Sequence, residues 1–233
     1  MEKGGIMKRF TLGIAVLAFV VLAGCSQKEN HLTEQSISNI EASVESPEKS
    51  AAEILNDLAG QEFSIQADQI SEDDYGSMEA FGKAFINLYT GAVANQERVS
   101  FENYISNENL LLFTNKMLEL EQRQDLKGAN GVIFGLNNEF KEAEFKRLDN
   151  NIYHLELSFL NQGSGMSCKL LVRSVNRSLQ IVDLYFGNKD GIDTMATGHP
   201  AVRRLDNPKL WDDQQWVEGV MEKLGQYETE LSS

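Results

Sequence analysis

Two side chains of the 233-residue chain have surroundings that suggest chemistry, the thiol of Cys25 and the carboxyl group of Asp183. Cys25 directly follows the tripeptide Leu22-Ala23-Gly24, and small residues before such a position are typical of a signal-peptide cleavage site. Asp183 lies inside the largely apolar run Leu179–Phe186. A carboxyl group in apolar surroundings has a raised pKa and can act as a general acid or base. Processing at Cys25 and acid–base chemistry at Asp183 are therefore the first hypotheses.

The residues before Cys25 follow the order of a secretory signal. Lys8 and Arg9 supply a positively charged start, and the run Leu12–Leu22 consists of apolar and small residues. This run is shorter than the roughly 20 residues that a membrane-spanning helix needs. We expect residues 1–24 to be a signal peptide that is removed.

The sequence Leu22-Ala23-Gly24-Cys25 resembles the lipobox of bacterial lipoproteins. In that family the cysteine thiol receives a diacylglyceryl group, and the signal is cut directly before the cysteine. The resemblance implies lipidation of Cys25, with acyl chains such as palmitate, and a protein held at the extracytoplasmic face of the cell membrane. Two acyl chains anchor a protein stably, because each buried CH₂ contributes about 0.8 kcal/mol. An ordinary secretory signal with a chance cysteine after the cut is the alternative.

The charge of the chain narrows the choice of partners. Its formal net charge is −14 at pH 7, and an acidic protein repels nucleic acid and anionic lipid headgroups. We therefore expect no nucleic-acid partner, and membrane contact only through the lipid on Cys25. With Cys25 lipidated, the second cysteine, Cys168, has no disulfide partner in the chain, and we expect it to be a small buried hydrophobe.

The chain divides into three parts on composition. After the signal, residues 25–74 are rich in polar and acidic residues, with one short helical pattern at Ala51–Leu58, and we expect a disordered tether. We place the folded domain at residues 75–233.

The first part of this domain has helical periodicity. Apolar residues recur at three-and-four spacing from Met78 to Ala92, and again from Leu110 to Leu120 after a possible cap at Asn107. The spacing predicts two helices that contribute their stripes to a core.

The middle of the domain changes to the period of two that is typical of strands. Turn signals separate four such segments: Phe140–Leu148, Tyr153–Phe159, Met166–Arg173 and Leu179–Phe186. Short turns predict that neighbouring strands pair antiparallel. Residues 187–205 show no clear period.

The end of the chain again has helical periodicity. We expect a helix capped by Asn207, with Val217, Val220 and Leu224 on its apolar face. Trp211 and Trp216, near its start, either form an exposed interaction patch or seal the edge of the sheet. The predicted fold is therefore α+β, with N-terminal helices packed on a curved four-stranded antiparallel meander and a C-terminal helix added.

The order of elements from Ser77 to Gly187 resembles the NTF2-like superfamily of cystatin-like α+β cones, which includes ketosteroid isomerase-like enzymes. The resemblance implies a pocket on the concave face of the sheet. The chain departs from that pattern because it lacks a clear extra hairpin between its two main helices and adds a C-terminal helix.

The pocket implied by this fold has five candidate residues. Asp183 would be its polar group, and the lining would come from aromatic residues: Tyr153, Phe159, Tyr185 and Phe186. A structural role for Asp183, as a hydrogen-bonded carboxylate, is the alternative. No motif of the superfamily assigns catalysis to Asp183, so no catalytic residue is named.

The sequence offers little for metals or cofactors. His154 stands alone, and the residues Asn188, Asp190 and Asp193 have only part of a calcium-loop pattern. We expect neither a metal nor a cofactor. Without a convincing set of acid, base and nucleophile, we expect a non-enzymatic binding or interaction module for a protein partner or a small apolar ligand. The alternative is a small-molecule-binding or isomerase-like enzyme that uses the concave face of the sheet.

Overall fold

The computed structural model describes residues 49–126, 134–187, 191–199 and 205–233. They belong to one compact unit that begins at Ser46. The predicted signal peptide, Cys25 and the part of the predicted tether up to residue 48 lie outside the described residues. Among the helices within the described ranges, none combines the length and the apolar character of a membrane span.

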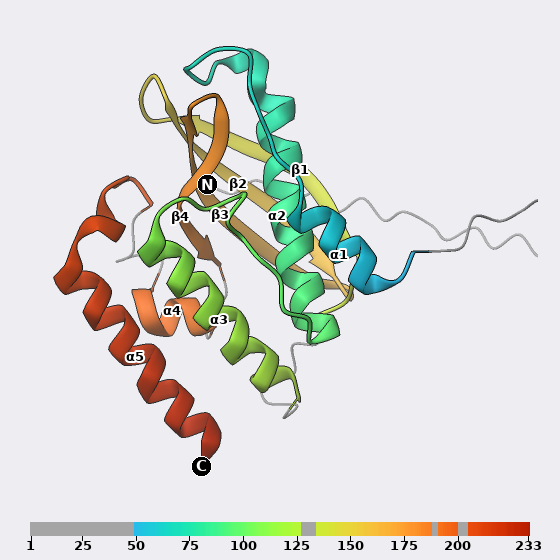
Figure 1. The fold of residues 1–233 in the computed structure, drawn as a ribbon, viewed down its shortest axis with the longest axis vertical. Helices are drawn as coiled ribbons and strands as arrows, with labels where there is room; N and C mark the ends of the chain where they lie inside the picture. Colours follow the sequence, from blue (N-terminus) through green and yellow to red (C-terminus); the bar gives the residue numbers. More distant parts are fainter. Residues whose placement is uncertain (1–48, 127–133, 188–190, 200–204) are drawn as a thin grey trace, which may run out of the picture. The chain divides into compact units, whose positions relative to one another are not determined.

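The fold is α+β, as predicted. Four strands pair antiparallel in the order β1-β2-β3-β4, and the sheet is open. The helices and strands are α1 (Ala51–Ala59), α2 (Tyr75–Asn95), α3 (Glu108–Leu126), β1 (Asn138–Arg147), β2 (Ile152–Asn161), β3 (Ser164–Val175), β4 (Ser178–Phe186), α4 (Ile192–Thr197) and α5 (Gln214–Ser232). In Figure 1, α2 lies across the sheet with α1 beside it, and α3, α4 and α5 lie together beyond β4.

The meander is held by two tight hairpins. Gln162 and Gly163 connect β2 to β3 with φ values of 52° and 79°, and Asn176 and Arg177 connect β3 to β4 with values of 53° and 65°. Two central residues with positive φ match the right-handed twist of the flanking strands. The predicted turns at these positions are confirmed.

The main core lies between α2 and the sheet. The stripe of α2 is fully buried, including Phe81, Phe85 and Tyr89, and it packs with Leu155 and Leu157 of β2. The apolar stripe that the sequence predicts for this helix therefore belongs to the hydrophobic core.

The folded unit begins upstream of residue 75, where the sequence analysis placed its start. Leu55, Ile65 and Ile70 are at most 4% exposed and belong to the main core. The Ser50 side chain caps α1 in a capping box with Glu53. The apolar residues of this segment have no regular spacing beyond Leu58, and for this reason its composition alone indicates a tether.

The C-terminal region differs from the prediction in two details. Asp213 caps α5, because its Oδ1 accepts a hydrogen bond from Trp216 N at 3.2 Å, whereas Asn207 opens a turn that leads to a 3₁₀ helix over Leu210–Asp212. The aperiodic segment after β4 contains α4, which is six residues long and was not predicted.

Candidate functional site

The residues predicted to line one pocket lie on two sides of the sheet. Tyr153, Phe159 and Phe186 point into the main core on the side of α2. Asp183 pairs with Leu171, and Tyr185 pairs with Lys169, so both point to the opposite side because successive side chains alternate along a strand. These five residues therefore do not form one cavity, and they line neither of the two pockets described below.

A bulge in β4 explains why Asp183 lies apart from Ile181. Ile181 pairs with Val172 and Asp183 pairs with Leu171, so Val182 is an extra residue in the ladder. Side chains along a strand point alternately to the two faces of the sheet, and a bulge shifts this alternation by one residue for the positions that follow it. Asp183 and Ile181 thus face opposite sides, although they are two residues apart.

Asp183 is fully buried and holds a structural hydrogen bond. Its Oδ1 accepts from Trp211 Nε1 at 2.6 Å and from Leu184 N at 3.0 Å. Trp211 is 1% exposed, and its ring centroid lies 4.8 Å from that of Phe113 in α3. This geometry favours the structural interpretation of Asp183, and it places Trp211 in the core rather than in an exposed patch.

Cys168 is fully buried in β3 and forms no disulfide. Burial raises the pKa of its thiol well above the usual value, with Asp193 and Glu156 adding smaller effects of the same sign. A thiol that stays protonated is a poor nucleophile. Cys168 is therefore a small hydrophobe, as predicted.

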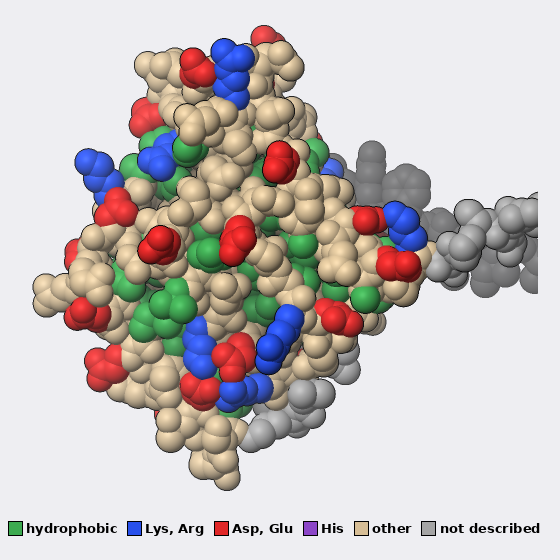
Figure 2. All heavy atoms as spheres, viewed as in Figure 1, with side chains coloured by type: hydrophobic (Ala, Val, Ile, Leu, Met, Phe, Trp, Pro, Cys, Tyr) green, Lys and Arg blue, Asp and Glu red, His purple; other side chains and the backbone are tan. Residues whose placement is uncertain are grey.

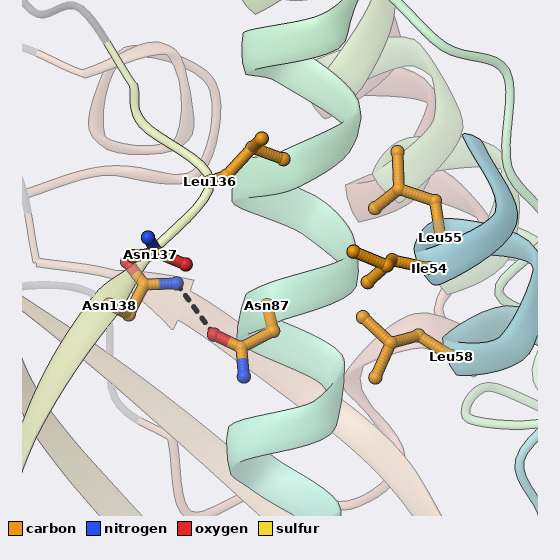
Figure 3. A pocket seen from close by; sticks show the side chains of 7 residues that line it. All are labelled: Ile54, Leu55, Leu58, Asn87, Leu136, Asn137 and Asn138. Carbon is orange, nitrogen blue, oxygen red and sulfur yellow. Dashed lines mark hydrogen bonds between the residues drawn. The ribbon is translucent and has the colours of Figure 1, made fainter. Parts of the chain in front are cut away.

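A surface groove of about 250 Å³ lies between α1, α2 and the start of β1 (Figure 3). Ile54, Leu55 and Leu58 of α1 form one wall, and Leu136 faces them across α2. The polar lining is formed by three asparagines: Asn87, Asn137 and Asn138.

The wall beside β1 is held in place by Asn161 at the end of β2. Asn161 is 2% exposed, accepts a hydrogen bond from Gly135 N at 2.8 Å and donates to Gly135 O at 3.0 Å. Its Nδ2 also donates to Asn138 Oδ1 at 2.7 Å. Asn138 in turn donates to Asn87 Oδ1 and Thr90 Oγ1 of α2, each at 2.8 Å. These hydrogen bonds within the protein therefore fix the position of the groove wall without a bound ligand.

The groove keeps both apolar surface and hydrogen-bonding groups open. Ile54 and Leu136 are 43% and 44% exposed. Asn87 accepts a hydrogen bond from Asn138 through Oδ1, but within the described residues its Nδ2 makes no hydrogen bond, and neither does the Asn137 side chain. Two amide groups are therefore available beside an aliphatic wall, and such groups can bind the backbone of a peptide.

A larger cleft of about 600 Å³ lies between the end of α2 and α3. Several of its polar side chains bind neighbouring residues. Gln122 donates to Ala92 O and Glu97 O, each at 2.9 Å, and Arg123 pairs with Glu119 and Glu228. These bonds hold α3 against its neighbours. The side chains of Arg98 and Asn115 make no hydrogen bond or ion pair within the described residues, but none of the notably exposed large apolar side chains lines the cleft, whereas Ile54 and Leu136 line the groove.

The described residues do not assemble a metal site: no three His, Cys, Asp or Glu side chains among them are placed to share an ion. In the loop with part of a calcium pattern, Asn188 and Asp190 lie outside the described residues. Asp193 accepts hydrogen bonds from Phe186 N and Thr197 Oγ1, each at 2.8 Å.

Comparisons of the chain with protein-family models, curated proteins and solved structures found no match. The likenesses to lipoproteins and to NTF2-like cones therefore stay predictions.

Sequence reasoning missed every residue of the groove. The lining comes from three segments that are distant along the chain, and no single segment carries an unusual motif. The available signal was weak: Leu136 is an apolar residue directly before the polar pair Asn137-Asn138.

Proposed function

We propose that this protein is a lipid-anchored binding module at the extracytoplasmic face of the cell membrane, and that it binds a protein partner rather than catalysing a reaction. The charged start, the short apolar run and the Leu22-Ala23-Gly24-Cys25 motif support lipidation of Cys25. The segment 26–49 before α1 would then reach up to roughly 80 Å when extended. The domain could thus meet a partner at some distance from the membrane.

The groove between α1, α2 and β1 is the observation that carries this proposal. Its volume of about 250 Å³ lies below the roughly 300–1,000 Å³ of pockets that enclose drug-sized ligands. A space of this size suits one or two aliphatic side chains of a protein segment. This argument favours a protein partner over a small apolar ligand.

The distribution of exposed apolar residues supports the same site. Four large apolar side chains are notably exposed among the described residues: Ile54, Leu112, Leu136 and Met195. Two of them, Ile54 and Leu136, line the groove. Apolar side chains that gather on the surface mark interaction sites more often than those that are scattered singly.

The charged groups argue against nucleic acid as the partner. Figure 2 shows Asp and Glu side chains spread over the face in view, with Lys and Arg side chains next to them rather than in a separate basic patch. The net charge of −14 points the same way.

The partner site can be tested by photo-crosslinking in cells that produce the full chain. A crosslinkable amino acid at position 136 should give a defined adduct with one protein, and Ile54→Asp should abolish this adduct. Position 112 is the matched control, because Leu112 is 55% exposed and lies outside the groove lining. Equal adducts at positions 112 and 136, or no adduct at 136, would contradict the proposal.

The anchor has a separate test. Cys25→Ala should abolish labelling with radioactive palmitate and release the protein from the membrane fraction. Labelling that persists in this variant would exclude Cys25 as the lipidated residue. A small ligand instead of a protein would appear as a bound mass in native mass spectrometry that Ile54→Asp removes.

A further inference from the structure

Glu121 lies where α3 meets three other helices. Its carboxyl group interacts electrostatically with Tyr89 of α2, Asp193 of α4 and Tyr227 of α5. The side chain is partly buried as a whole, but its Oε2 is shielded from solvent and makes no hydrogen bond. Glu121 is four residues after Met117, so it occupies the apolar stripe of α3.

The hydroxyl of Tyr89 in α2 lies beside this carboxyl group. Tyr89 is fully buried, and its ring centroid lies 4.7 Å from that of Phe186. Its hydroxyl lies close enough to the Glu121 carboxyl group to favour the ionised form, although it does not reach full hydrogen-bond geometry. A carboxyl group with one oxygen that is shielded from water and accepts no hydrogen bond is more stable in the neutral form than in the ionised form. Burial accordingly raises the pKa of Glu121 to about 7, with a smaller increase from Asp193 and a partial decrease from the Tyr89 hydroxyl.

The other charged groups at this contact do not neutralise Glu121. Asp193 has the same sign, and Cys168 of β3, which lies near Tyr89 and Asp193, is kept protonated by burial. The cations between α3 and α5, Lys116 and Arg123, pair with Glu228 at 2.8 and 2.7 Å. Lys223 of α5 donates to Ala196 O at the end of α4 at 3.2 Å. None of these cations is among the groups that shift the pKa of Glu121, so they would not compensate its negative charge.

We propose that the proton on Glu121 controls how tightly α4 and α5 pack against α3. With the proton bound, the neutral carboxyl group stays in the contact between the helices. When the proton leaves to bulk water, the carboxylate repels Asp193 and gains solvation by opening the contact. This effect of Glu121 protonation on helix packing does not depend on the lipid anchor or on the groove.

The end of β4 would respond to this opening. Asp193 of α4 accepts the hydrogen bond from Phe186 N, and Thr194 shares a 2.7 Å hydrogen bond with the Tyr185 hydroxyl. A shift of α4 would strain both bonds. The proton on Glu121 is thus linked to the last two residues of the sheet.

Hydrogen–deuterium exchange of the full chain tests this inference. After correction for intrinsic exchange rates, the opening constant of α4 and α5 should rise about tenfold per pH unit from pH 4.5 to 7 and then level off. Between pH 5 and 7.5, protection should fall on the order of a hundredfold in α4 and α5, and at each pH these helices should exchange faster than the buried amides of α2, because they open without global unfolding.

Glu121→Gln keeps the shape of the neutral side chain and should keep α4 and α5 protected at both pH values. The matched control is Glu222→Gln, which changes an exposed carboxylate of α5 and should preserve the pH dependence. Tyr89→Phe removes the hydroxyl that lowers the pKa of Glu121, so it should move the midpoint of the transition to higher pH. An unchanged pH dependence in Glu121→Gln would overturn the proposal, and so would equal opening constants in α4, α5, α2 and the sheet, because equal constants would show global unfolding alone. If Glu121→Gln does not fold, the midpoint of the pH transition in Tyr89→Phe is the test. A midpoint equal to that of wild type would then overturn the proposal.

Discussion

Trp211 Nε1 donates a hydrogen bond to Asp183 Oδ1 at 2.6 Å, and both residues are buried. The bond joins the segment before α5 to β4, 28 residues away along the chain. A buried hydrogen bond to a carboxyl oxygen is costly to break on one side only, because the remaining group stays buried without its partner. This pair therefore fixes the C-terminal part of the domain to the sheet.

Removing the indole donor should destabilise the domain. Trp211→Phe keeps an aromatic ring near Phe113 but leaves Asp183 Oδ1 without its indole partner, which should cost about 2–3 kcal/mol. Urea unfolding at pH 7 measures the change. Asp183→Asn retains an acceptor oxygen and should cost less. A loss below about 0.5 kcal/mol for Trp211→Phe would mean that the bond does not hold the two segments together.

A second prediction concerns the close contact between α2 and the sheet at Gly82. A Cβ atom at this position would lie 2.5 Å from Leu157 Cδ1 and 2.8 Å from Leu155 Cδ2, and both leucines are fully buried. Overpacking costs about 1–3 kcal/mol, while the helix propensity of alanine offsets only about 1 kcal/mol. Gly82→Ala should therefore lower the free energy of unfolding.

Gly76, also in α2, provides the control. A Cβ atom there has no neighbour within 4 Å. Gly76→Ala should leave stability unchanged or raise it by up to about 1 kcal/mol. Similar effects of the two substitutions would show that packing against the sheet does not decide the outcome at Gly82.

The periodic elements were predictable because one period extends over many residues. The stripe of Phe81, Phe85 and Tyr89 identified α2, and the alternation around Leu155 and Leu157 identified β2. The hairpin turns were predictable because they depend on local residue types. Together these features determined the α+β fold.

The position of Asp183 was not predictable in the same way. Its side depends on the bulge at Val182, and one extra residue in an apolar strand has no distinct sequence signal. The groove was missed because it joins distant segments. Glu121 is different, because the sequence places a carboxyl group in the apolar stripe of α3, four residues after Met117. Helical periodicity alone considers only the apolar residues of such a stripe, so it does not identify this position.

Asn161 should control the shape of the groove. Asn161→Ala removes both hydrogen bonds to Gly135 and the bond to Asn138, so the wall that presents Leu136 loses its support. The cost in stability should be about 1–3 kcal/mol. Crosslinking from position 136 should also fall. Asn161→Asp keeps the acceptor for Gly135 N and should show a smaller effect on both measurements, whereas full crosslinking in Asn161→Ala would contradict this role.

Stability should depend on pH through Glu121. Its pKa in the folded protein is about 7, above the ordinary value of 4.5, so the folded state binds this proton more tightly than the unfolded state. The resulting stabilisation is complete below pH 4.5 and is lost as the pH rises through 7. Its size should be about 3 kcal/mol, from about 1.4 kcal/mol for each pKa unit.

Other carboxylates act in the opposite direction, so the effect of Glu121 must be measured as a difference. Hydrogen bonding to Lys116 lowers the pKa of Glu228, and this pair adds stability as the pH rises through the acid range. Urea unfolding of wild type and Glu121→Gln from pH 4.5 to 8 separates the two effects. Glu121→Gln should gain about 3 kcal/mol over wild type across this range, because the variant has no proton to lose. Glu222→Gln should follow wild type at every pH, and a constant difference between Glu121→Gln and wild type would show that Glu121 does not titrate in the folded protein.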